Sequence, residues 1–212
     1  TAASFYRLTD TCLQPGNSAI SNVIQVTANN FLNCYCQPST FSCADLRITN
    51  ITLPNSTINN NSACSAGGYA NYTGAGSATV YRNQPIYVQH TVSNTFNIPY
   101  AVGIWVDLNH DAVFGPNEFS VNGPLTGATG GSQFLIPPTA LTGETRMRVG
   151  IKYDNGNIPQ LSGSEACASS SFAGEFEDYK IIIADAANCS GAVSAGTISA
   201  VSQICPNNNF TI

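Results

Sequence analysis

Short runs of β-branched and aromatic residues, separated by glycine, proline and asparagine, constrain this chain more than any other feature. The clearest runs are 86–92, 100–107, 145–153 and 176–183. Such runs indicate β-strands, and no window has a useful amphipathic helical pattern. Many short strands separated by turn residues are typical of an all-β sandwich of jelly-roll or immunoglobulin-like type.

Eight cysteines stand in a chain in which only 9% of residues are charged. An even number of cysteines in such a chain favours structural disulfides, and hence an oxidising, extracellular location. The one close pair, Cys34 and Cys36, lacks the spacing of a zinc site. The spacing does not determine which cysteines are bonded to each other.

The charge balance and the lengths of the apolar runs argue against two classes of partner. Seven lysines and arginines face twelve acidic residues, for a net charge of −5. A nucleic-acid binder needs a basic face, so we expect no nucleic-acid partner. No apolar run approaches the roughly 18 residues of a membrane-spanning helix, so we expect no membrane insertion.

The acidic stretch 107–118 has the ligand spacing of a calcium loop of the EF-hand type. Oxygen-bearing side chains occupy its first, third, fifth and twelfth positions, and the seventh offers a carbonyl. The predicted ligands are Asp107, Asn109, Asp111, Val113 and Glu118. Ala112 stands where the sharp turn prefers glycine, and a strand rather than a helix enters the loop. The alternative is a loop held by local hydrogen bonds of its Asn and Asp side chains.

A second acidic cluster begins the run 176–183. Glu175 and Glu177 share one face of a strand, and Asp178 lies on the other. At least one of these carboxylates is expected to be buried, which requires a cation or several N–H donors. Glu177 and Asp178 are therefore weaker candidates for metal ligands. The alternative is an ion-pair network between strands, with three candidate partners: Arg146, Arg148 and Lys152.

Nothing in the sequence indicates catalysis. The two histidines are His90, expected on a sheet face, and His110, expected to point to solvent from the acidic loop. The chain lacks the common metalloprotease, serine-hydrolase and phosphate-loop motifs. We therefore expect that the protein is not an enzyme.

Two aromatic groups suggest different roles. The single Trp105 lies inside a predicted strand and is expected in the core. Tyr69 and Tyr72 lie in a loop rich in glycine and asparagine, where they are weak candidates for ligand binding.

Several ordered motifs resemble the GEVED domain. They lie at 35–43, 47–73, 104–119, 145–154 and 173–181. The closing motif 174–178 has Phe176 in place of valine, and the resemblance covers 35–184. It implies an extracellular β-sandwich in secreted, multi-domain proteins of the Bacteroidetes, often exported by the type IX route. It supplies no catalytic residue, and Ala112 replaces the glycine usual in the family's acidic loop.

The two ends resemble parts of immunoglobulin-like domains. Residues 1–34 are similar to the last strands of a preceding domain, and 185–212 to the first strands of a following one, as in long bacterial surface proteins. The resemblance implies that four cysteines pair with flanking domains: Cys12, Cys34, Cys189 and Cys205. The central domain then keeps Cys36, Cys43, Cys64 and Cys167. The alternative is a complete protein in which Cys12 and Cys205 pair with each other or across chains.

These observations predict a non-catalytic structural or adhesive module. We expect a repeat or stalk unit of a large cell-surface adhesin or filament, stabilised by disulfides and calcium. Its expected partners are neighbouring domains of the same chain, with glycans or surface receptors as further partners. The alternative is a carbohydrate-binding accessory module of a secreted multi-domain enzyme.

Overall fold

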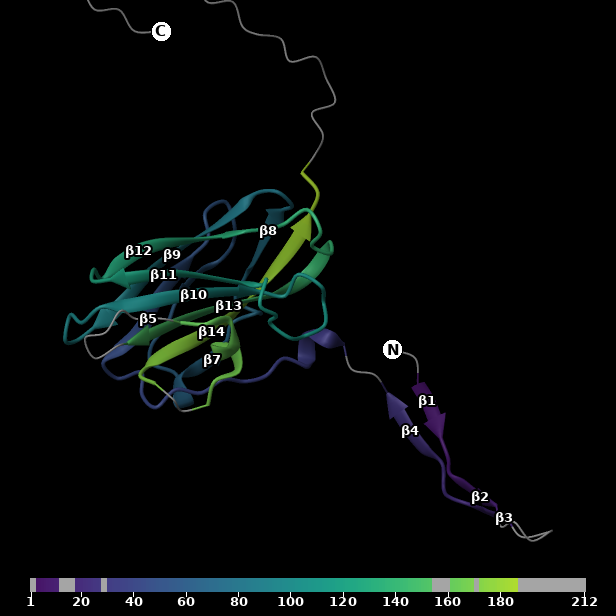
Figure 1. The fold of residues 1–212 in the computed structure, drawn as a ribbon. Coiled ribbons are helices and arrows are strands. Elements are labelled where there is room, and N and C mark those ends of the chain that lie inside the picture. Colours follow the sequence, from purple (N-terminus) through teal and green to yellow (C-terminus); the bar gives the residue numbers. More distant parts are fainter. Residues whose placement is uncertain (1–2, 12–17, 28–29, 154–160, 170–171, 187–212) are drawn as a thin grey trace, which may run out of the picture.

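Two β-sheets packed face to face form the body of the molecule in this computed structural model (Figure 1). The structure describes residues 3–11, 18–27, 30–153, 161–169 and 172–186. Every regular element within those residues is a β-strand or a short 3₁₀ turn. The prediction of an all-β sandwich is therefore confirmed.

The larger sheet has six strands, in the order β11-β10-β13-β14-β7, with β8 also paired to β14. Their bounds are β7 Tyr69–Asn71, β8 Ser77–Tyr81, β10 Tyr100–Val106, β11 Phe119–Leu125, β13 Gly143–Tyr153 and β14 Gly174–Ala184. β7 and β8 run parallel to successive stretches of β14, and the other pairs are antiparallel. β14 is therefore held along both edges.

The smaller sheet has four strands, in the order β12-β9-β5-β6. Their bounds are β5 Leu46–Thr52, β6 Asn59–Asn61, β9 Pro85–Asn94 and β12 Thr129–Leu135. Burial alternates along β9, where Ile86, Val88, His90 and Val92 are buried and the residues between them are not. This period of two places one face of the sheet against the core and leaves the other toward water.

The main core lies between the two sheets. Its buried side chains come from strands of both, as the alternation in β9 requires. The largest completely buried members are Leu46, Ile48, Ile51, Ile58, Tyr100, Ile104, Ile136, Met147 and Tyr179.

A second, smaller apolar cluster covers the outer face of the six-stranded sheet. Trp105 and Phe176 lie at its centre, and Tyr35, Phe114 and Ala166 pack over them from the chain before β5, the acidic loop and the 3₁₀ turn η3 (Gly163–Cys167). Because both faces are covered, all of β10 is buried. This confirms that Trp105 is a core residue, and its indole N–H donates to the carbonyl of Gly163 at 3.0 Å.

Two glycines make room for the Trp105 ring. A Cβ on Gly103 would lie 2.7 Å from that ring, and a Cβ on Gly150 would lie 2.6 Å from the ring of Phe176 and 3.0 Å from Trp105. Such distances are shorter than van der Waals contact, so only glycine allows the rings to approach the sheet this closely.

A separate antiparallel ribbon precedes the sandwich (Figure 1). β1 (Ala3–Tyr6) pairs with β4 (Ile24–Thr27), and β2 (Thr9–Thr11) pairs with β3 (Ser18–Ile20). Its apolar side chains are exposed, for example Phe5 at 65% and Leu8 at 72%. A two-stranded unit this exposed has no core of its own. Its assignment to a preceding immunoglobulin-like domain stays a prediction, and the segment 187–212 lies outside the described residues.

A 3₁₀ turn, η1 (Phe31–Asn33), and another, η2 (Ala66–Gly68), complete the regular elements in the part of the chain that the structure describes. No helix in that part is long and apolar enough to cross a membrane.

Candidate functional site

The motif 174–178 opens β14 and is completely enclosed. Its three acidic residues, Glu175, Glu177 and Asp178, have no exposed surface. Glu175 and Glu177 point toward the interior between the sheets, whereas Asp178 points to the outer face that the second cluster covers. Each carboxylate must therefore be satisfied by donors of the protein, and each meets a different set.

Glu175 connects the two sheets. Its Oε2 accepts from the backbone N–H of Ile48 in β5 at 3.0 Å, and its Oε1 accepts from that of Ser65 at 2.8 Å. Burial raises the pKa of Glu175, and the two N–H donors oppose that shift. The side chain thus supplies acceptors for two backbone groups that belong to another part of the fold.

Glu177 meets the hydroxyl of Tyr179, which donates to its Oε2 at 2.5 Å. The side-chain amide of Asn60 donates to the same hydroxyl at 3.1 Å. Burial raises the pKa of Glu177 to about 7. The hydrogen bonds with Ser62 and Tyr179 lower this pKa but only partly oppose the effect of burial. This group therefore exchanges its proton near neutral pH, in the interior of the sandwich.

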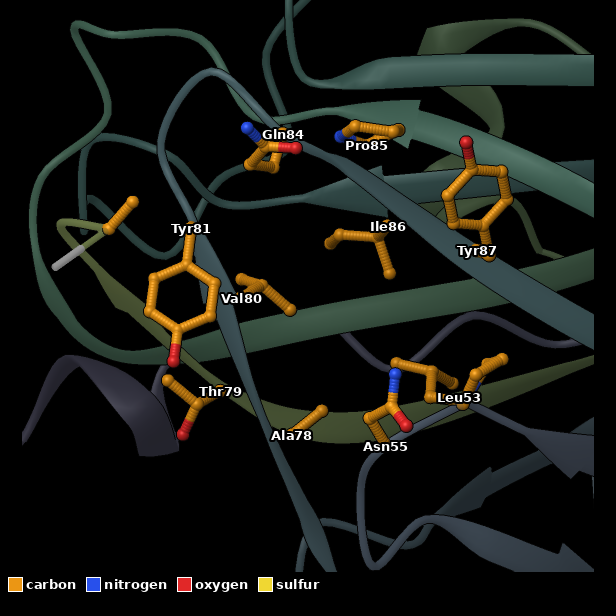
Figure 2. Close-up of a pocket in the computed structure, with 12 residues that line it drawn as sticks. Leu53, Asn55, Ala78, Thr79, Val80, Tyr81, Gln84, Pro85, Ile86 and Tyr87 are labelled. Atoms are coloured by element: carbon orange, nitrogen blue, oxygen red, sulfur yellow. The ribbon is translucent and has the colours of Figure 1, made fainter. Parts of the chain in front are cut away.

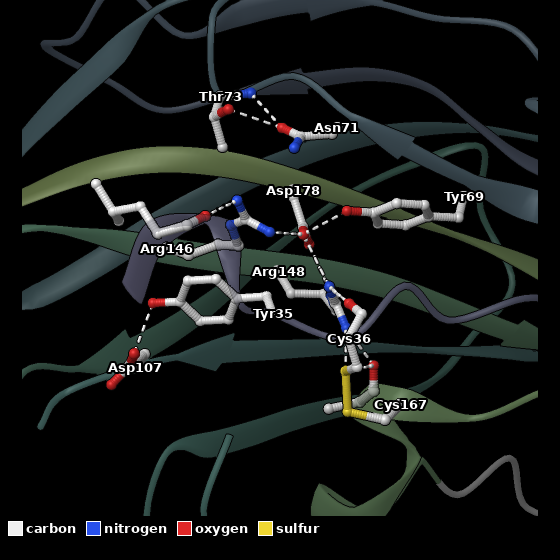
Figure 3. Close-up of polar contacts among 12 residues, drawn as sticks. Tyr35, Cys36, Tyr69, Asn71, Thr73, Asp107, Arg146, Arg148, Cys167 and Asp178 are labelled. Atoms are coloured by element: carbon white, nitrogen blue, oxygen red, sulfur yellow. Dashed lines mark hydrogen bonds and ion pairs between the residues drawn. A yellow bond between two sulfur atoms is a disulfide. The ribbon is translucent and has the colours of Figure 1, made fainter. Parts of the chain in front are cut away.

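Asp178 is held by two arginines of the neighbouring strand β13. Arg148 binds it at two points, Nε to Oδ1 at 2.6 Å and Nη2 to Oδ2 at 2.8 Å. Arg146 adds a bond from Nη1 to Oδ2 at 3.1 Å, and the Tyr69 hydroxyl donates to the same oxygen at 2.8 Å. Figure 3 shows these three side chains around the carboxylate. Two-point pairing of a guanidinium with a carboxylate fixes the geometry of both.

The remaining N–H groups of Arg148 reach the chain around a disulfide. Cys36 and Cys167 are bonded, and Arg148 Nη2 donates to the carbonyl of Cys36 at 2.8 Å. Arg148 Nη1 donates to the carbonyl of Ala166. The completely buried arginine thus joins the sheet to both of the chain segments that the disulfide connects (Figure 3).

Arg146 links this ion pair to the acidic loop. Its guanidinium lies 4.2 Å from the centre of the Tyr35 ring, and its Nη2 donates to the carbonyl of Leu32 at 2.6 Å. The Tyr35 hydroxyl donates to Asp107 Oδ2 at 2.5 Å. Burial, followed by the bond to Asp107, raises the pKa of Tyr35. One continuous polar network therefore runs from Asp178 to Asp107 beneath the second cluster.

Asp178 lies in an ion-pair network of the kind that the alternative interpretation of the second acidic cluster expects. Both of its oxygens accept hydrogen bonds from guanidinium groups, and its role as a metal ligand stays a prediction. Lys152, the third candidate cation, instead pairs with Glu165 at 2.7 Å. Among the described residues, no group of three or more His, Cys, Asp or Glu side chains is arranged to hold a metal, so Glu177 as a ligand also stays a prediction.

The acidic loop is organised by Asp107, which is completely buried. Its Oδ1 accepts from the backbone N–H of Asn109 at 3.2 Å and of His110 at 2.7 Å, and its Oδ2 accepts from that of Ala112 at 3.0 Å. Ala112 has φ of 65°, the conformation that favours glycine. The sharp turn at the sixth position therefore forms, although a side chain is present.

Three of the other four predicted ligands, Asn109, Asp111 and Glu118, also accept hydrogen bonds within the loop. Glu118 accepts from the N–H groups of Leu108 and Gly115, and burial raises its pKa. Asp111 accepts from the backbone of Val113 and from the side chain of Asn109, as the hydrogen-bonded alternative expects. In this arrangement the oxygens face N–H and O–H donors rather than a common point, and calcium at this loop stays a prediction.

Four of the cysteines form two disulfides, Cys36–Cys167 and Cys43–Cys64. The expectation of structural disulfides is therefore confirmed, and it supports an oxidising, extracellular environment. Cys34 is exposed and is not bonded to another described cysteine. Cys12, Cys189 and Cys205 lie outside the described residues.

The two tyrosines predicted to bind a ligand both pack against other residues of the domain. Tyr69 is half-buried against Arg148 and Asp178, and burial raises its pKa to about 12. Tyr72 packs on Tyr179, with ring centres 6.0 Å apart. Ligand binding at these two tyrosines stays a prediction.

The two histidines have different environments. His90 lies on the inner face of β9, where burial lowers its pKa to about 4, and its Nε2 lies 3.3 Å from the Tyr100 hydroxyl. The expectation that His110 points to solvent is wrong, because its ring stacks on Phe31 at 5.0 Å between centres. The segment before the sandwich folds back over the loop and supplies that partner.

The sequence did not predict an open groove where β8 ends and β9 begins. It has a volume of about 520 Å³, and Figure 2 shows Val80 and Ile86 between the rings of Tyr81 and Tyr87. The two rings are 42% and 54% exposed. The alternation within these two strands could have placed both tyrosines on outward faces. That the two rings lie on either side of one groove depends on how the strands pair, which the sequence does not show.

The comparison with family models supports part of the resemblance. The model described as the GEVED domain matches residues 101–182. This match identifies that segment with the GEVED domain. The match runs from β10 to β14 and includes the acidic loop, both arginines and the closing motif. No curated protein matches the chain. In the GEVED domain of this chain, the motif for which the family is named is a buried hydrogen-bonding and ion-pairing centre.

Proposed function

We propose that this chain is a non-catalytic, load-bearing module of a longer extracellular protein, such as a repeat or stalk unit of a surface adhesin or filament. The observation that carries the proposal is the Cys36–Cys167 disulfide. Cys36 precedes every strand of the sandwich, and Cys167 directly precedes β14, the last strand. The bond therefore joins the entrance of the domain to its final element.

This connection protects the sandwich from tension along the chain. A force between the segment before Cys36 and the segment after β14 passes through the disulfide and does not stretch the 131-residue separation between the two cysteines. Only β14 and the short chain before it lie in the path of the force. β14 is paired with β13 along its length and with β7 and β8 on its other edge, so it resists removal.

The buried ion pair supports the same junction. Arg148 donates to the carbonyls on both sides of the disulfide and binds Asp178 of β14. The entrance, the turn before β14 and β14 itself are thus joined by covalent and polar bonds at one place. The partners that this proposal implies are neighbouring domains of the same long chain.

Single-molecule stretching of the full chain between handles at its ends tests the proposal. We expect the oxidised chain to release only a short length when the domain opens. A variant with both Cys36→Ser and Cys167→Ser leaves Cys43–Cys64 in place and should release roughly 110 further residues, about 400 Å of extended chain. A Cys34→Ser variant is the control, because it leaves both disulfides intact. Equal lengths, or equal opening forces, for the oxidised chain and the double variant would overturn the proposal.

Calcium at the acidic loop is part of the proposal, and the spacing of its five predicted ligands is what supports it. Calcium should then raise the melting temperature of the full chain relative to chelator, because a ligand of the folded state stabilises it by mass action. Asp111→Ala should remove that increase, since Asp111 is exposed and its loss leaves the Asp107 hydrogen bonds in place. A melt that calcium does not change would remove calcium from the proposal.

A second candidate function, glycan binding by an accessory module, is favoured by the groove between Tyr81 and Tyr87. Exposed aromatic rings beside neutral polar side chains suit the faces and hydroxyls of uncharged sugars. Titration with cellohexaose and xylohexaose would test it, with Tyr87→Ala as the variant. Phe96→Ala is the control, because Phe96 is an exposed aromatic residue outside the groove. Absence of binding, or equal binding by both variants, would exclude this function.

A further inference from the structure

A small polar pocket lies on the outer face of the six-stranded sheet, beside the ion-pair network. Its volume is about 310 Å³. The strands β7, β13 and β14 and the turn η1 form its walls. The polar side chains of its lining that bear on binding are Asn30, Asn71, Thr73, Glu144, Arg146 and Lys180.

Arg146 supplies the buried end of this pocket. Its side chain is only 8% exposed, and its Nε is buried without a hydrogen-bond partner among the described residues. Its Nη1 and Nη2 are used by Asp178 and by the Leu32 carbonyl. The guanidinium is thus fixed beneath the pocket, where its positive charge favours an anion by Coulomb attraction.

The amide side chains around the mouth present donors. The oxygen of Asn30 accepts from the backbone of Leu32 at 3.0 Å, and the oxygen of Asn71 accepts from the backbone and hydroxyl of Thr73 at 3.0 and 2.7 Å. Their NH₂ groups donate to no acceptor within the described part of the chain. The oxygens are thus occupied and the N–H groups are available.

The charged side chains of the pocket also favour an anion, because cations outnumber carboxylates there. Arg146 and Lys180 are cross-strand partners on β13 and β14. The single carboxylate of the lining, Glu144, lies 4.0 Å from Lys180 Nζ, a distance that leaves the lysine loosely held. Arg148 and Asp178 compensate each other deeper in the sheet, so the pocket retains one net positive charge on a chain whose net charge is −5.

We propose that this pocket binds the carboxylate of an acidic sugar, with the sugar hydroxyls against the amide side chains. The cationic and donor-rich lining selects an anion, because the Lys180 ammonium and the amide N–H groups favour a charged acceptor. The volume and the polar walls suit one hydroxylated ring rather than an apolar molecule. This binding activity is independent of the load-bearing function proposed above, since it uses neither disulfide.

Titration of the full chain with D-galacturonate and D-glucuronate, followed by amide chemical shifts and calorimetry at constant ionic strength, tests the proposal. We expect millimolar or tighter binding, with the largest shifts at Asn71, Thr73 and Gly74. D-galactose lacks the carboxylate and should bind at least tenfold more weakly. Acetate and sulfate lack the ring and should also bind more weakly.

Two variants at the mouth should act in opposite directions. Lys180→Gln should weaken galacturonate binding about fivefold or more, and Glu144→Gln should strengthen it, because the first removes a cation and the second removes the one carboxylate. Both side chains are partly exposed, at 34% and 46%, so both variants should fold. Arg82→Gln, which removes a cation outside the pocket, should leave binding unchanged.

Several results would overturn the proposal. One is no shift at these amides with either uronate. Another is equal binding of galactose, which would show that the carboxylate is not recognised. Equal binding of acetate or sulfate would show a non-specific anion site. A response to Lys180→Gln that Arg82→Gln reproduces would place the effect in the overall charge of the chain.

Discussion

Asp178 and Arg148 face each other across β14 and β13, joined by two hydrogen bonds of 2.6 and 2.8 Å with no exposed surface on either side chain. Removing two such charges from water is costly, and the pair is tolerated only because every remaining N–H of the guanidinium finds an acceptor. The pair therefore makes the folded state specific rather than simply more stable. The bonds from Arg148 to the carbonyls of Cys36 and Ala166 position the chain around the disulfide, and Tyr69 and Arg146 also donate to Asp178.

Breaking this pair on one side should be severe. We expect Arg148→Met to lower the free energy of unfolding by about 3–5 kcal/mol, because it leaves a buried carboxylate with weaker partners. Guanidinium chloride denaturation measures this. The double variant Arg148→Met, Asp178→Leu should recover part of the loss. Arg82→Gln, which breaks the exposed pair with Asp185, should cost less than about 1 kcal/mol. A small cost for Arg148→Met would show that the pair is not desolvated as described.

Glu177 should make stability depend on pH near neutrality. Its pKa is raised from an ordinary 4.5 to about 7 in the folded chain, so the folded state retains a proton that the unfolded state loses. The stabilisation is complete below about pH 4.5 and is lost as the pH rises through 7, on the order of 3 kcal/mol in all. We expect Glu177→Gln to melt higher than the native chain at pH 8 and to flatten the pH profile.

Glu175 is the matched control for that pH prediction. It accepts from two backbone N–H groups, and an amide can offer only one acceptor oxygen to them. Glu175→Gln should therefore lower the melting temperature at every pH between 5 and 8. If both variants gave the same dependence of melting temperature on pH, the assignment of separate roles to the two glutamates would be wrong.

Asp107 should stabilise the loop without any metal. It accepts four hydrogen bonds, three from the backbone of the loop and one from Tyr35. Asp107→Ala should therefore cost about 3 kcal/mol in denaturant titrations with chelator present, since it leaves buried N–H groups unpaired. Asp111→Ala, at an exposed position of the same loop, should cost less than about 1 kcal/mol there. Equal small costs would contradict the hydrogen-bonded loop.

The space around Trp105 should not accept a methyl group. Gly150→Ala places a Cβ 2.6 Å from the Phe176 ring, so the rings or the sheet must shift. We expect a loss of about 1–3 kcal/mol and a change in tryptophan fluorescence, because Trp105 is the one tryptophan of the chain. Gly74→Ala is the control, since nothing lies within 4 Å of its Cβ position.

Some of the site could be predicted from the strand pattern alone. The alternation in 145–153 places Arg146 and Arg148 on one face and Met147 and Val149 on the other, and β13 has this arrangement. The same rule separates Asp178 from Glu175 and Glu177 in β14. What the alternation could not show is that the arginine face is also buried, because the cover comes from Tyr35 and Phe114, far away in the sequence.

The sequence by itself determined the all-β class of fold, the expectation of disulfides and hence of an oxidising environment, and the similarity of residues 101–182 to the GEVED domain. These follow from local properties: side-chain period, turn residues, cysteine number and motif order. Only the tertiary structure decided which cation meets Asp178, that Asp107 collects backbone N–H groups, that His110 stacks on Phe31, and that three strands and a turn enclose a donor-lined pocket. Each of these depends on strand register and on chain segments that meet across long separations, which no local pattern specifies.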